Sequence, residues 1–322
     1  MNGTLSTPDS QEFIKSAWRD QTKWSETANH LKAELFRWRY LAAIAGVLGA
    51  FLETLATTLD GLGENWWWLR ALVALTGAVV LAFVPYVLKT KVSKDRISEW
   101  VSARSASEAL KETIYRYLVG APPFRSASTS TDLIERCRSI KEKVRDLNLY
   151  AAAVEPPQKV RPLMLTIDDY VQSRVNDQID QYYLPKGRDK ANKAKRLHGL
   201  EFWLGAIAVV MGALASAAVA TGLKQLSALG PWVAVVTTAS AAVTAHLAAS
   251  RYDHEAIIYF GTADRLTTAR DKWLSDPNRM SSDCVAKFVD NCEHAISTEN
   301  EAWLAKWTRD QPEDTAEPAS ES

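Results

Sequence analysis

The sequence predicts an all-α membrane protein with two transmembrane helical hairpins, four spans in all, joined to long helices outside the membrane. Three observations predict this fold class. Four stretches are long and apolar enough to cross a bilayer, they pair across short loops, and aromatic residues such as Trp66–Trp68 and Trp232 flank them. A soluble helical protein with unusually apolar core helices is the alternative, because the mean hydropathy of the whole chain is close to zero.

The expected spans cover residues 40–59, 66–88, 202–223 and 232–250. The third span is the clearest, because Phe202–Leu223 contains no charged residue. At about 1.5 Å of helical rise per residue, its 22 residues reach roughly 33 Å, which is enough to cross the hydrocarbon core of a bilayer.

Basic residues next to the spans predict the orientation. Clusters of lysine and arginine occur at residues 32–39, 89–96 and 186–196, whereas the two hairpin loops contain only Lys224. Short segments rich in lysine and arginine stay on the cytoplasmic side. We therefore expect a multi-pass protein of the cell inner membrane with both termini and the central segment in the cytoplasm.

This topology divides the chain into seven expected segments. They are a cytoplasmic N-terminal helix (1–39), the first transmembrane hairpin (40–88), the cytoplasmic helices of the first half (89–155), a cytoplasmic helix that enters the second half (156–199), the second transmembrane hairpin (200–250), the cytoplasmic C-terminal helices (251–308) and a disordered acidic tail (309–322). No signal peptide precedes the first span, so that span is expected to direct insertion.

Glycine, proline and capping residues predict the helix ends outside the spans. A helix that begins near Ser93 is expected to end at Gly120. Asp132 can cap a second helix, with Glu135 three residues later, and this helix is expected to run to about Val154. We therefore expect two long helices after the first hairpin.

The chain approaches the second hairpin through a helix that is expected to begin near Leu165. We expect an interruption at Pro185, because proline lacks an amide hydrogen and clashes with the preceding helical turn. The dipeptide Asp177-Gln178 in this segment matches Asp20-Gln21 before the first hairpin. Two hairpins in the same orientation, each preceded by such a segment, indicate an internal duplication.

Glu53 is the carboxylate that lies within a predicted span. A charge at this depth costs several kcal/mol unless it is paired, protonated or hydrated. Helical spacing places Glu53 on the same face as Gly46 and Gly49. Three interpretations follow: an ion pair with Arg70 across the hairpin, a carboxylate that lines a pore or senses protons, or a side chain that reaches the interface.

Small and hydroxylated residues follow one face of each span, as in helices that pack closely in lipid. Gly212 and Ser216 lie on such a face in the third span, and Thr238 does so in the fourth. These faces suit packing within one chain or between copies. His246, one turn from the cytoplasmic end of the fourth span, suits a hydrogen-bonded histidine at the interface or a group that titrates near neutral pH.

Sparse motifs outside the spans occur in three places. Trp100, Arg104, Glu108 and Glu112 follow the first hairpin; Arg174, Asp177, Gln178 and Tyr182 precede the second; Glu293, Glu299 and Trp303 lie near the end of the chain. This pattern resembles the SLATT family of two-transmembrane-helix effector domains over roughly residues 10–308. The resemblance implies a tandem of two such domains, and a membrane-perturbing or pore-forming effector of bacterial conflict and nucleotide-signalling systems.

Motifs for catalysis, cofactor binding or metal binding are missing from the sequence. The cysteines Cys137, Cys284 and Cys292 do not have the spacing of a zinc site or a redox motif. The basic residues lie next to the predicted spans, where membrane topology explains them, so they do not indicate nucleic-acid binding. We therefore expect a non-enzymatic effector that binds the lipid bilayer, forms homo-oligomers and responds to a separate nucleotide-signalling or sensor partner. The alternative is a non-catalytic membrane anchor or scaffold that presents its cytoplasmic helices to other proteins.

Overall fold

The structure is a computed structural model that describes residues 8–59, 64–124, 130–157, 165–222 and 229–309. These residues form helices and connecting turns without any strand, which confirms the all-α class. The hairpin loops at 60–63 and 223–228 and the expected acidic tail at 310–322 lie outside the described residues.

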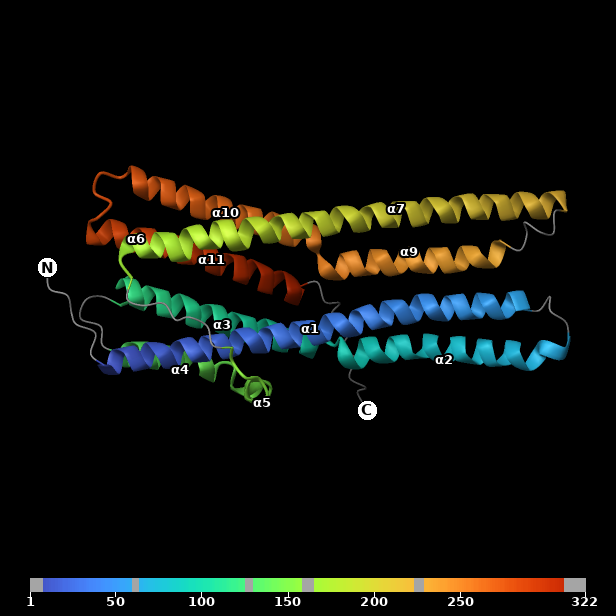
Figure 1. Ribbon diagram of the computed structural model, residues 1–322, viewed down its shortest axis with the longest axis horizontal. Helices are drawn as coiled ribbons and strands as arrows, with labels where there is room; N and C mark the ends of the chain where they lie inside the picture. Colours follow the sequence, from blue (N-terminus) through green and yellow to red (C-terminus); the bar gives the residue numbers. More distant parts are fainter. Residues whose placement is uncertain (1–7, 60–63, 125–129, 158–164, 223–228, 310–322) are drawn as a thin grey trace, which may run out of the picture. The chain divides into compact units, whose positions relative to one another are not determined.

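The two halves of the chain share one order of elements (Figure 1). The first half contains α1 (Pro8–Thr58), η2 (Glu64–Trp66), α2 (Trp67–Lys91), α3 (Lys94–Val119), α4 (Ser130–Glu142), η3 (Arg145–Leu147) and α5 (Asn148–Ala152). The second half contains α6 (Ile167–Tyr170), η4 (Val171–Asn176), η5 (Gln178–Tyr183), α7 (Leu184–Thr221), α9 (Gly230–Ser250), α10 (Tyr252–Ser275) and α11 (Ser282–Arg309). In each half a long helix leads into a span, a second span returns, and two further helices follow.

Contacts group the chain into two units, each with parts of both halves. The spanning unit consists of the described residues within Ala33–Ser93 and Asp180–Gly261. The polar unit consists of the described residues up to Lys32, from Lys94 to Ile179 and from Thr262 onward. Four helices are long and apolar enough to cross a membrane, and their apolar parts all belong to the spanning unit.

Close backbone approach holds the hairpins of the spanning unit together. α1 and α2 lie side by side (Figure 1), and a methyl group built on Gly49 would lie only 2.5 Å from Leu81 Cγ. α7 packs against α9 and buries Ala208, Ala215 and Ala218 along one side. Large apolar side chains instead point outward, as expected of a surface that faces lipid.

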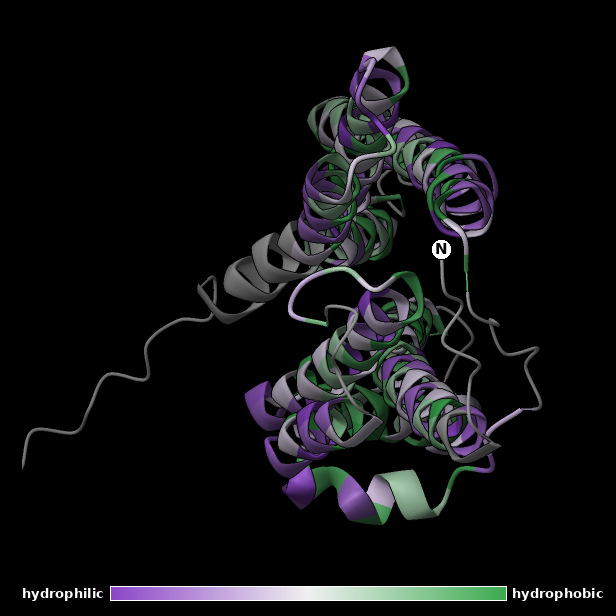
Figure 2. Cartoon of the chain, turned by 90° about the vertical axis from the view of Figure 1, so that its left-hand side faces the viewer, coloured by the Kyte–Doolittle hydropathy of each residue, from purple (hydrophilic) through white to green (hydrophobic). Residues whose placement is uncertain are grey.

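The polar unit has a hydrophobic core of its own. Leu110 and Ile114 of α3, Leu133 of α4, Leu266 of α10 and Val289 of α11 are completely buried. Figure 2 shows hydrophilic and hydrophobic residues interspersed along these helices, as amphipathic packing requires. α3 packs against both α4 and α11, so this core joins the two halves of the sequence.

The expected interruption at Pro185 is wrong. Pro185 lies in the first turn of α7, and helical structure runs without a break from Ile167 to Thr221. Its missing amide hydrogen costs little there, because a wider π-helical turn at Gln178–Tyr183 comes directly before it.

The single helix expected from Asp132 to Val154 is also wrong, because α4 ends at Glu142. Two short helical segments, η3 and α5, replace its second part. Val144 and Leu147 are both buried, and the amide of Leu147 donates to the carbonyl of Val144 at 3.0 Å. The chain bends here, because the tighter turn directs both side chains into the core.

Two joints next to the spans involve left-handed backbone. Gly222 ends α7 with a φ of 74°, a conformation that glycine adopts without a steric penalty. Arg251 has a φ of 50° and is the single residue between α9 and α10. Its amide donates to the carbonyl of Leu247 at 2.9 Å, so the joint is closely hydrogen-bonded.

Candidate functional site

A buried ion pair lies at the centre of the polar unit. The Arg174 side chain of η4 is 1% exposed and the Glu293 side chain of α11 is 0% exposed. Arg174 Nε donates to Glu293 Oε1 at 2.9 Å, and Arg174 Nη2 donates to Oε2 at 2.7 Å. This two-point geometry is the strongest arrangement of guanidinium and carboxylate, and it offsets the cost of removing both charges from water.

Aromatic residues complete the surroundings of the ion pair. The Tyr170 hydroxyl donates to Glu293 Oε1 at 2.9 Å, and the Arg174 guanidinium lies 4.6 Å from the centre of the Tyr115 ring. Arg174 Nη1 is buried and has no hydrogen-bond acceptor among the described residues. The Tyr115 ring therefore provides the guanidinium with a cation–π contact on its open face.

Burial and the Glu293 charge both act on the pKa values of Arg174 and Tyr170, in opposite directions at Arg174 and in the same direction at Tyr170. Burial alone disfavours the charged guanidinium, but the Glu293 carboxylate keeps the pKa of Arg174 above its usual value. Burial also raises the pKa of Tyr170 well above its usual range, and the Glu293 charge adds to this effect. At neutral pH Arg174 is charged and Tyr170 is a neutral donor.

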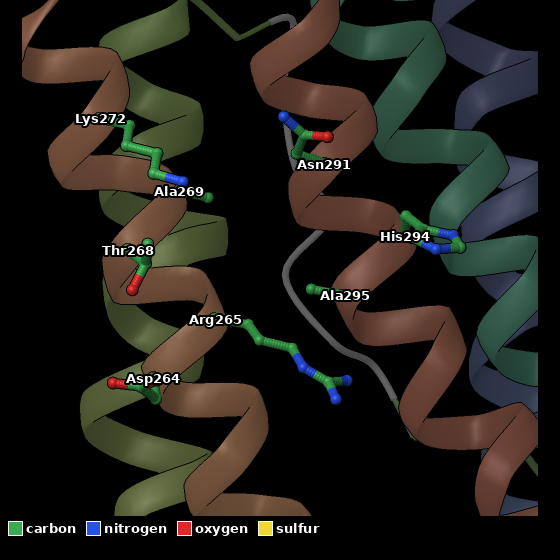
Figure 3. Close-up of a pocket in the computed structure, with 8 residues that line it drawn as sticks. All are labelled: Asp264, Arg265, Thr268, Ala269, Lys272, Asn291, His294 and Ala295. Carbon is green, nitrogen blue, oxygen red and sulfur yellow. The ribbon is translucent and has the colours of Figure 1, made fainter.

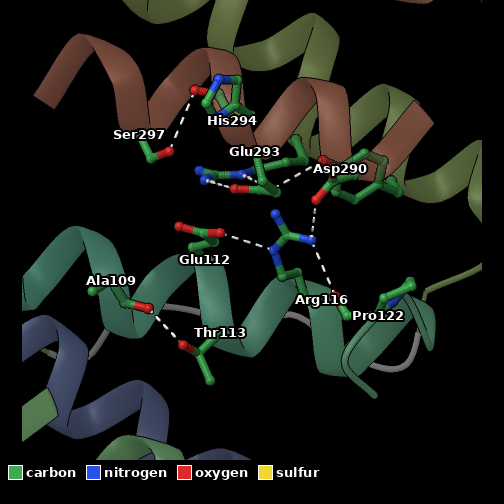
Figure 4. A network of polar contacts seen from close by, with 11 residues as sticks. Ala109, Glu112, Thr113, Arg116, Pro122, Asp290, Glu293, His294 and Ser297 are labelled. Atoms are coloured by element: carbon green, nitrogen blue, oxygen red, sulfur yellow. Dashed lines mark hydrogen bonds and ion pairs between the residues drawn. The ribbon is translucent and has the colours of Figure 1, made fainter. Parts of the chain in front are cut away.

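A second ion-pair group extends from this centre along α3 (Figure 4). Arg116 Nε donates to Glu112 Oε1 at 2.8 Å, and Arg116 Nη1 donates to Asp290 Oδ1 at 2.9 Å. Arg116 Nη1 also donates to the Pro122 carbonyl at 3.1 Å. Gly120, with a φ of 70°, turns the chain back after α3 and so brings Pro122 within reach.

The same face of α3 presents further charges to Arg174. Arg104 Nη2 lies 3.7 Å from Glu108 Oε1. Burial tends to raise the pKa of Glu108, but the charges of Arg104, Lys111 and Arg174 outweigh it and lower that pKa. Burial and the Arg174 charge lower the pKa of Lys111 from 10.5 to about 8. Lys111 is therefore the member of this group whose charge is least favoured.

These residues form one network that we name the ion-pair cluster: Arg104, Glu108, Lys111, Glu112, Arg116, Tyr170, Arg174, Asp290 and Glu293. It connects α3 of the first half with η4 and α11 of the second. Its carboxylates and guanidiniums already bind each other, an arrangement that fixes helix register and suits a structural role. Among the described residues, groups of acids, histidines and cysteines able to hold a metal ion are absent.

Several motif positions from the sequence meet in this cluster. Arg174 and Glu293 pair directly, and Glu108 and Glu112 lie close enough for the Arg174 charge to shift their pKa values. Sequence reasoning missed Tyr170, Lys111 and the Arg116–Asp290 pair. The spacing of Glu112 and Arg116, four residues apart on a helix, was a signal that could have identified Arg116.

Other motif positions lie elsewhere. Trp100 is buried, with Lys32 Nζ 5.2 Å from its ring centre. Asp177 and Gln178 are half-buried in the polar unit, whereas Tyr182 belongs to the spanning unit and packs edge-on against Tyr183 and Tyr259. The side chains of Glu299 and Trp303 lie outside the described part of the structure.

Glu53 packs against α2 inside the first hairpin. A methyl group built on Gly77 would lie 2.9 Å from Glu53 Oε1, so the carboxylate occupies the space beside this glycine. In the same antiparallel register, Gly49 lies beside Leu81. Arg70 is therefore level with the end of α1 next to the hairpin loop, about two helical turns from Glu53. The structure shows no ion pair between these two side chains, because their positions along the hairpin differ by about two helical turns.

The small residues of the spans have different surroundings. Gly46 and Gly212 have open space around them, since a methyl group built on either would meet nothing within 4 Å. Gly46 and Thr238 line a pocket of about 380 Å³ between α1, α2 and α9. Ser216 is exposed on α7, away from the side that packs against α9.

His246 lies near the end of α9 and contacts residues beyond the span. Its Nε2 atom is 3.3 Å from the Tyr252 hydroxyl and 3.4 Å from Ser250 Oγ. Ser250 is buried, and Tyr252 begins α10. His246 therefore takes part in the polar contacts at the joint between α9 and α10.

Family comparisons identify the domain that contains this geometry. A model described as SMODS and SLOG-associating 2TM effector domain 1 (SLATT) matches residues 170–303. Residues 170–303 therefore match the SLATT domain family. This match includes Tyr170, Arg174 and Glu293, together with the second hairpin, and a SLATT domain implies a membrane-associated effector.

The first half matches a different model, described as a protein of unknown function (DUF4231), over residues 20–132. The expected tandem of two SLATT domains is thus supported in part. The SLATT model matches the second half, whereas the first half matches the DUF4231 model. Searches of curated proteins and of solved structures find no match.

Breaking the central ion pair should destabilise the polar unit strongly. We expect Glu293→Gln to cost about 3–5 kcal/mol, because it leaves the buried Arg174 charge without its counter-ion. Thermal unfolding of the detergent-solubilised protein, followed by circular dichroism, measures the loss. The double variant Arg174→Met/Glu293→Leu is the control, and we expect it to be more stable than Glu293→Gln. Equal stability of Glu293→Gln and the unmodified protein would refute a stabilising pair.

Lys111 should make stability rise with pH in an alkaline window. Its pKa is about 8 in the folded protein and 10.5 when solvated, so the unfolded state binds more protons between these values. The penalty for burying its charge is complete below pH 8 and disappears as pH rises towards 10.5. We expect the unfolding temperature of Lys111→Gln to change less with pH across this window. Lys143→Gln, at an exposed position, should keep the pH dependence of the unmodified protein. Parallel curves for all three proteins would contradict this assignment.

Proposed function

We propose that this protein is an inner-membrane effector, with both termini in the cytoplasm, whose spans associate with those of other copies and make the membrane leaky. The family match supports a membrane-associated effector, and the spans supply the surface for assembly. This activity needs no catalytic residue or cofactor. The trigger is proposed to come from a separate nucleotide-signalling or sensor partner, in a bacterial defence context.

The observation that carries the proposal is the outer face of α7. Ala208, Ala215 and Ala218 are buried on the side that packs against α9, whereas Ser216 is exposed and Gly212 has open space beside it. Helices associate in lipid where small residues allow their backbones to approach closely. Because Ser216 is exposed and Gly212 leaves open space beside it, this part of α7 suits contact with another copy.

Glu53 supports a permeation role within the same spans. Its carboxylate lies beside Gly77 and has no hydrogen-bond or ion-pair partner among the described residues. A carboxylate at membrane depth marks a functional position by default, because it needs water, a proton or a cation. We propose that assembly brings Glu53 into contact with a hydrated path.

The repeated order of elements supports an additional role for the first half. α1 to α4 follow the same sequence of long helix, returning span and two further helices as α6 to α11. We propose that the first half is a divergent domain of the same type, so one chain contributes two hairpins to an assembly.

Substitutions on adjacent residues of α7 test self-association. Ser216→Leu places a bulky side chain on the small-residue face, and Ala217→Leu places the same side chain about 100° around the helix, also at an exposed position. We expect chemical crosslinking in native membranes to give a ladder of oligomers for the unmodified protein and for Ala217→Leu. Ser216→Leu should reduce the ladder at least several-fold. Equal ladders for both variants would exclude this face as the contact.

Leakage from vesicles tests the permeation role of Glu53. We expect purified protein in liposomes to release a cationic dye, and Glu53→Gln to reduce the rate several-fold, because it removes the charge while keeping the shape. Glu142→Gln, the same neutralisation on exposed α4, is the control. Vesicles that remain tight with the unmodified protein at every protein-to-lipid ratio would contradict leakage altogether.

A membrane anchor is the second candidate, and the independent core of the polar unit favours it. In this case the spans only tether helices such as α3 and α11, which bind partner proteins. Replacing all four spans by unrelated apolar helices should then preserve activity, whereas the effector proposal expects activity to disappear.

A further inference from the structure

A pocket opens between α10 and α11 in the polar unit, within the SLATT domain (Figure 3). Its volume is about 590 Å³, which is within the range of small-molecule sites. Arg265, Thr268 and Lys272 line it from α10, and Asn291 and Ala295 line it from α11. The pocket is separate from the ion-pair cluster, and none of its lining residues belongs to that cluster.

Small residues at the centre of this helix pair explain the pocket. On the buried side, Trp273 stacks on Phe288 with ring centres 4.9 Å apart, and Leu266 is completely buried. On the open side, Ala269 and Ala295 face each other across helices whose axes normally lie 8–10 Å apart. Their methyl groups are too short to fill this gap, so a space remains between the longer side chains.

The long side chains at the pocket carry positive charge. Arg265 and Lys272 are two helical turns apart, about 10.5 Å along α10, and the Arg265 side chain extends across the gap towards α11 (Figure 3). Neither residue has an acidic or hydrogen-bonding partner among the described side chains. By contrast, Arg270 on the same helix binds Asn176 at 2.9 Å and Asp271 at 3.1 Å.

We propose that this pocket binds a small soluble molecule that carries a diphosphate or triphosphate. Arginine donates two parallel hydrogen bonds to phosphate, and lysine adds a mobile point charge. The Thr268 hydroxyl and the Asn291 amide supply further donors at the same opening. Two cations on one helix face match a ligand with several adjacent negative charges better than a monoanion.

Asp264 allows a test of the charge of the ligand. Its carboxylate also lines the pocket, next in sequence to Arg265, and it should repel an anionic ligand. Neutralising Asp264 and neutralising Arg265 should therefore change affinity in opposite directions. A pocket that bound a cation or a neutral apolar molecule would not give this pattern.

The test is calorimetric titration of the full-length protein with inorganic pyrophosphate, in nanodiscs of phosphatidylcholine at fixed ionic strength. We expect Arg265→Gln to weaken binding at least tenfold and Asp264→Asn to tighten it several-fold. Lys143→Gln, which removes an exposed charge outside α10 and α11, should leave affinity unchanged. Inorganic monophosphate should bind more weakly than pyrophosphate.

Three outcomes would overturn the proposal. They are absence of pyrophosphate binding by a protein that unfolds at its normal temperature, equal weakening by Arg265→Gln and Lys143→Gln, and loss of binding when the nanodiscs contain phosphatidylglycerol. The last result would assign the site to a lipid headgroup. Because binding is measured without leakage, failure of this proposal and failure of the permeation proposal are distinguishable.

Discussion

The polar unit depends on the burial of a complete positive charge at Arg174. A guanidinium that is 1% exposed has lost its hydration, so nearby groups must offset the cost of burying its charge. Glu293 supplies the counter-charge, and the Tyr170 hydroxyl donates a hydrogen bond to the same carboxylate. The Tyr115 ring packs against the face of the guanidinium. Since these groups come from three separate parts of the chain, the ion pair requires both halves to be folded and correctly in register.

The spanning unit is stabilised by the opposite means. Its hairpins rely on Gly49, Gly77 and a row of alanines that allow backbones to approach, because lipid provides no hydrophobic force between apolar helices. The most deeply buried ion pair thus lies in the polar unit, whereas the hairpins of the spanning unit are held mainly by close packing of small residues.

Periodicity and composition were sufficient to predict the fold class and the four spans, because membrane thickness allows few other solutions for uncharged stretches of such length. The Arg174–Glu293 pair was not predictable as a contact, since 119 residues separate its members and only tertiary packing unites them. The neighbour of Glu53 depended on the register of the α1–α2 hairpin, which counting residues from the loop does not determine. Pro185 misled because propensity rules ignore the wider turn that precedes it.

Arg251 has a mechanical consequence. Only this left-handed residue separates α9 from α10, and its amide donates to the carbonyl of Leu247. The connection between the two helices is therefore as short as a single residue. A change in the backbone angles of Arg251 alone would therefore change the direction in which α10 leaves α9.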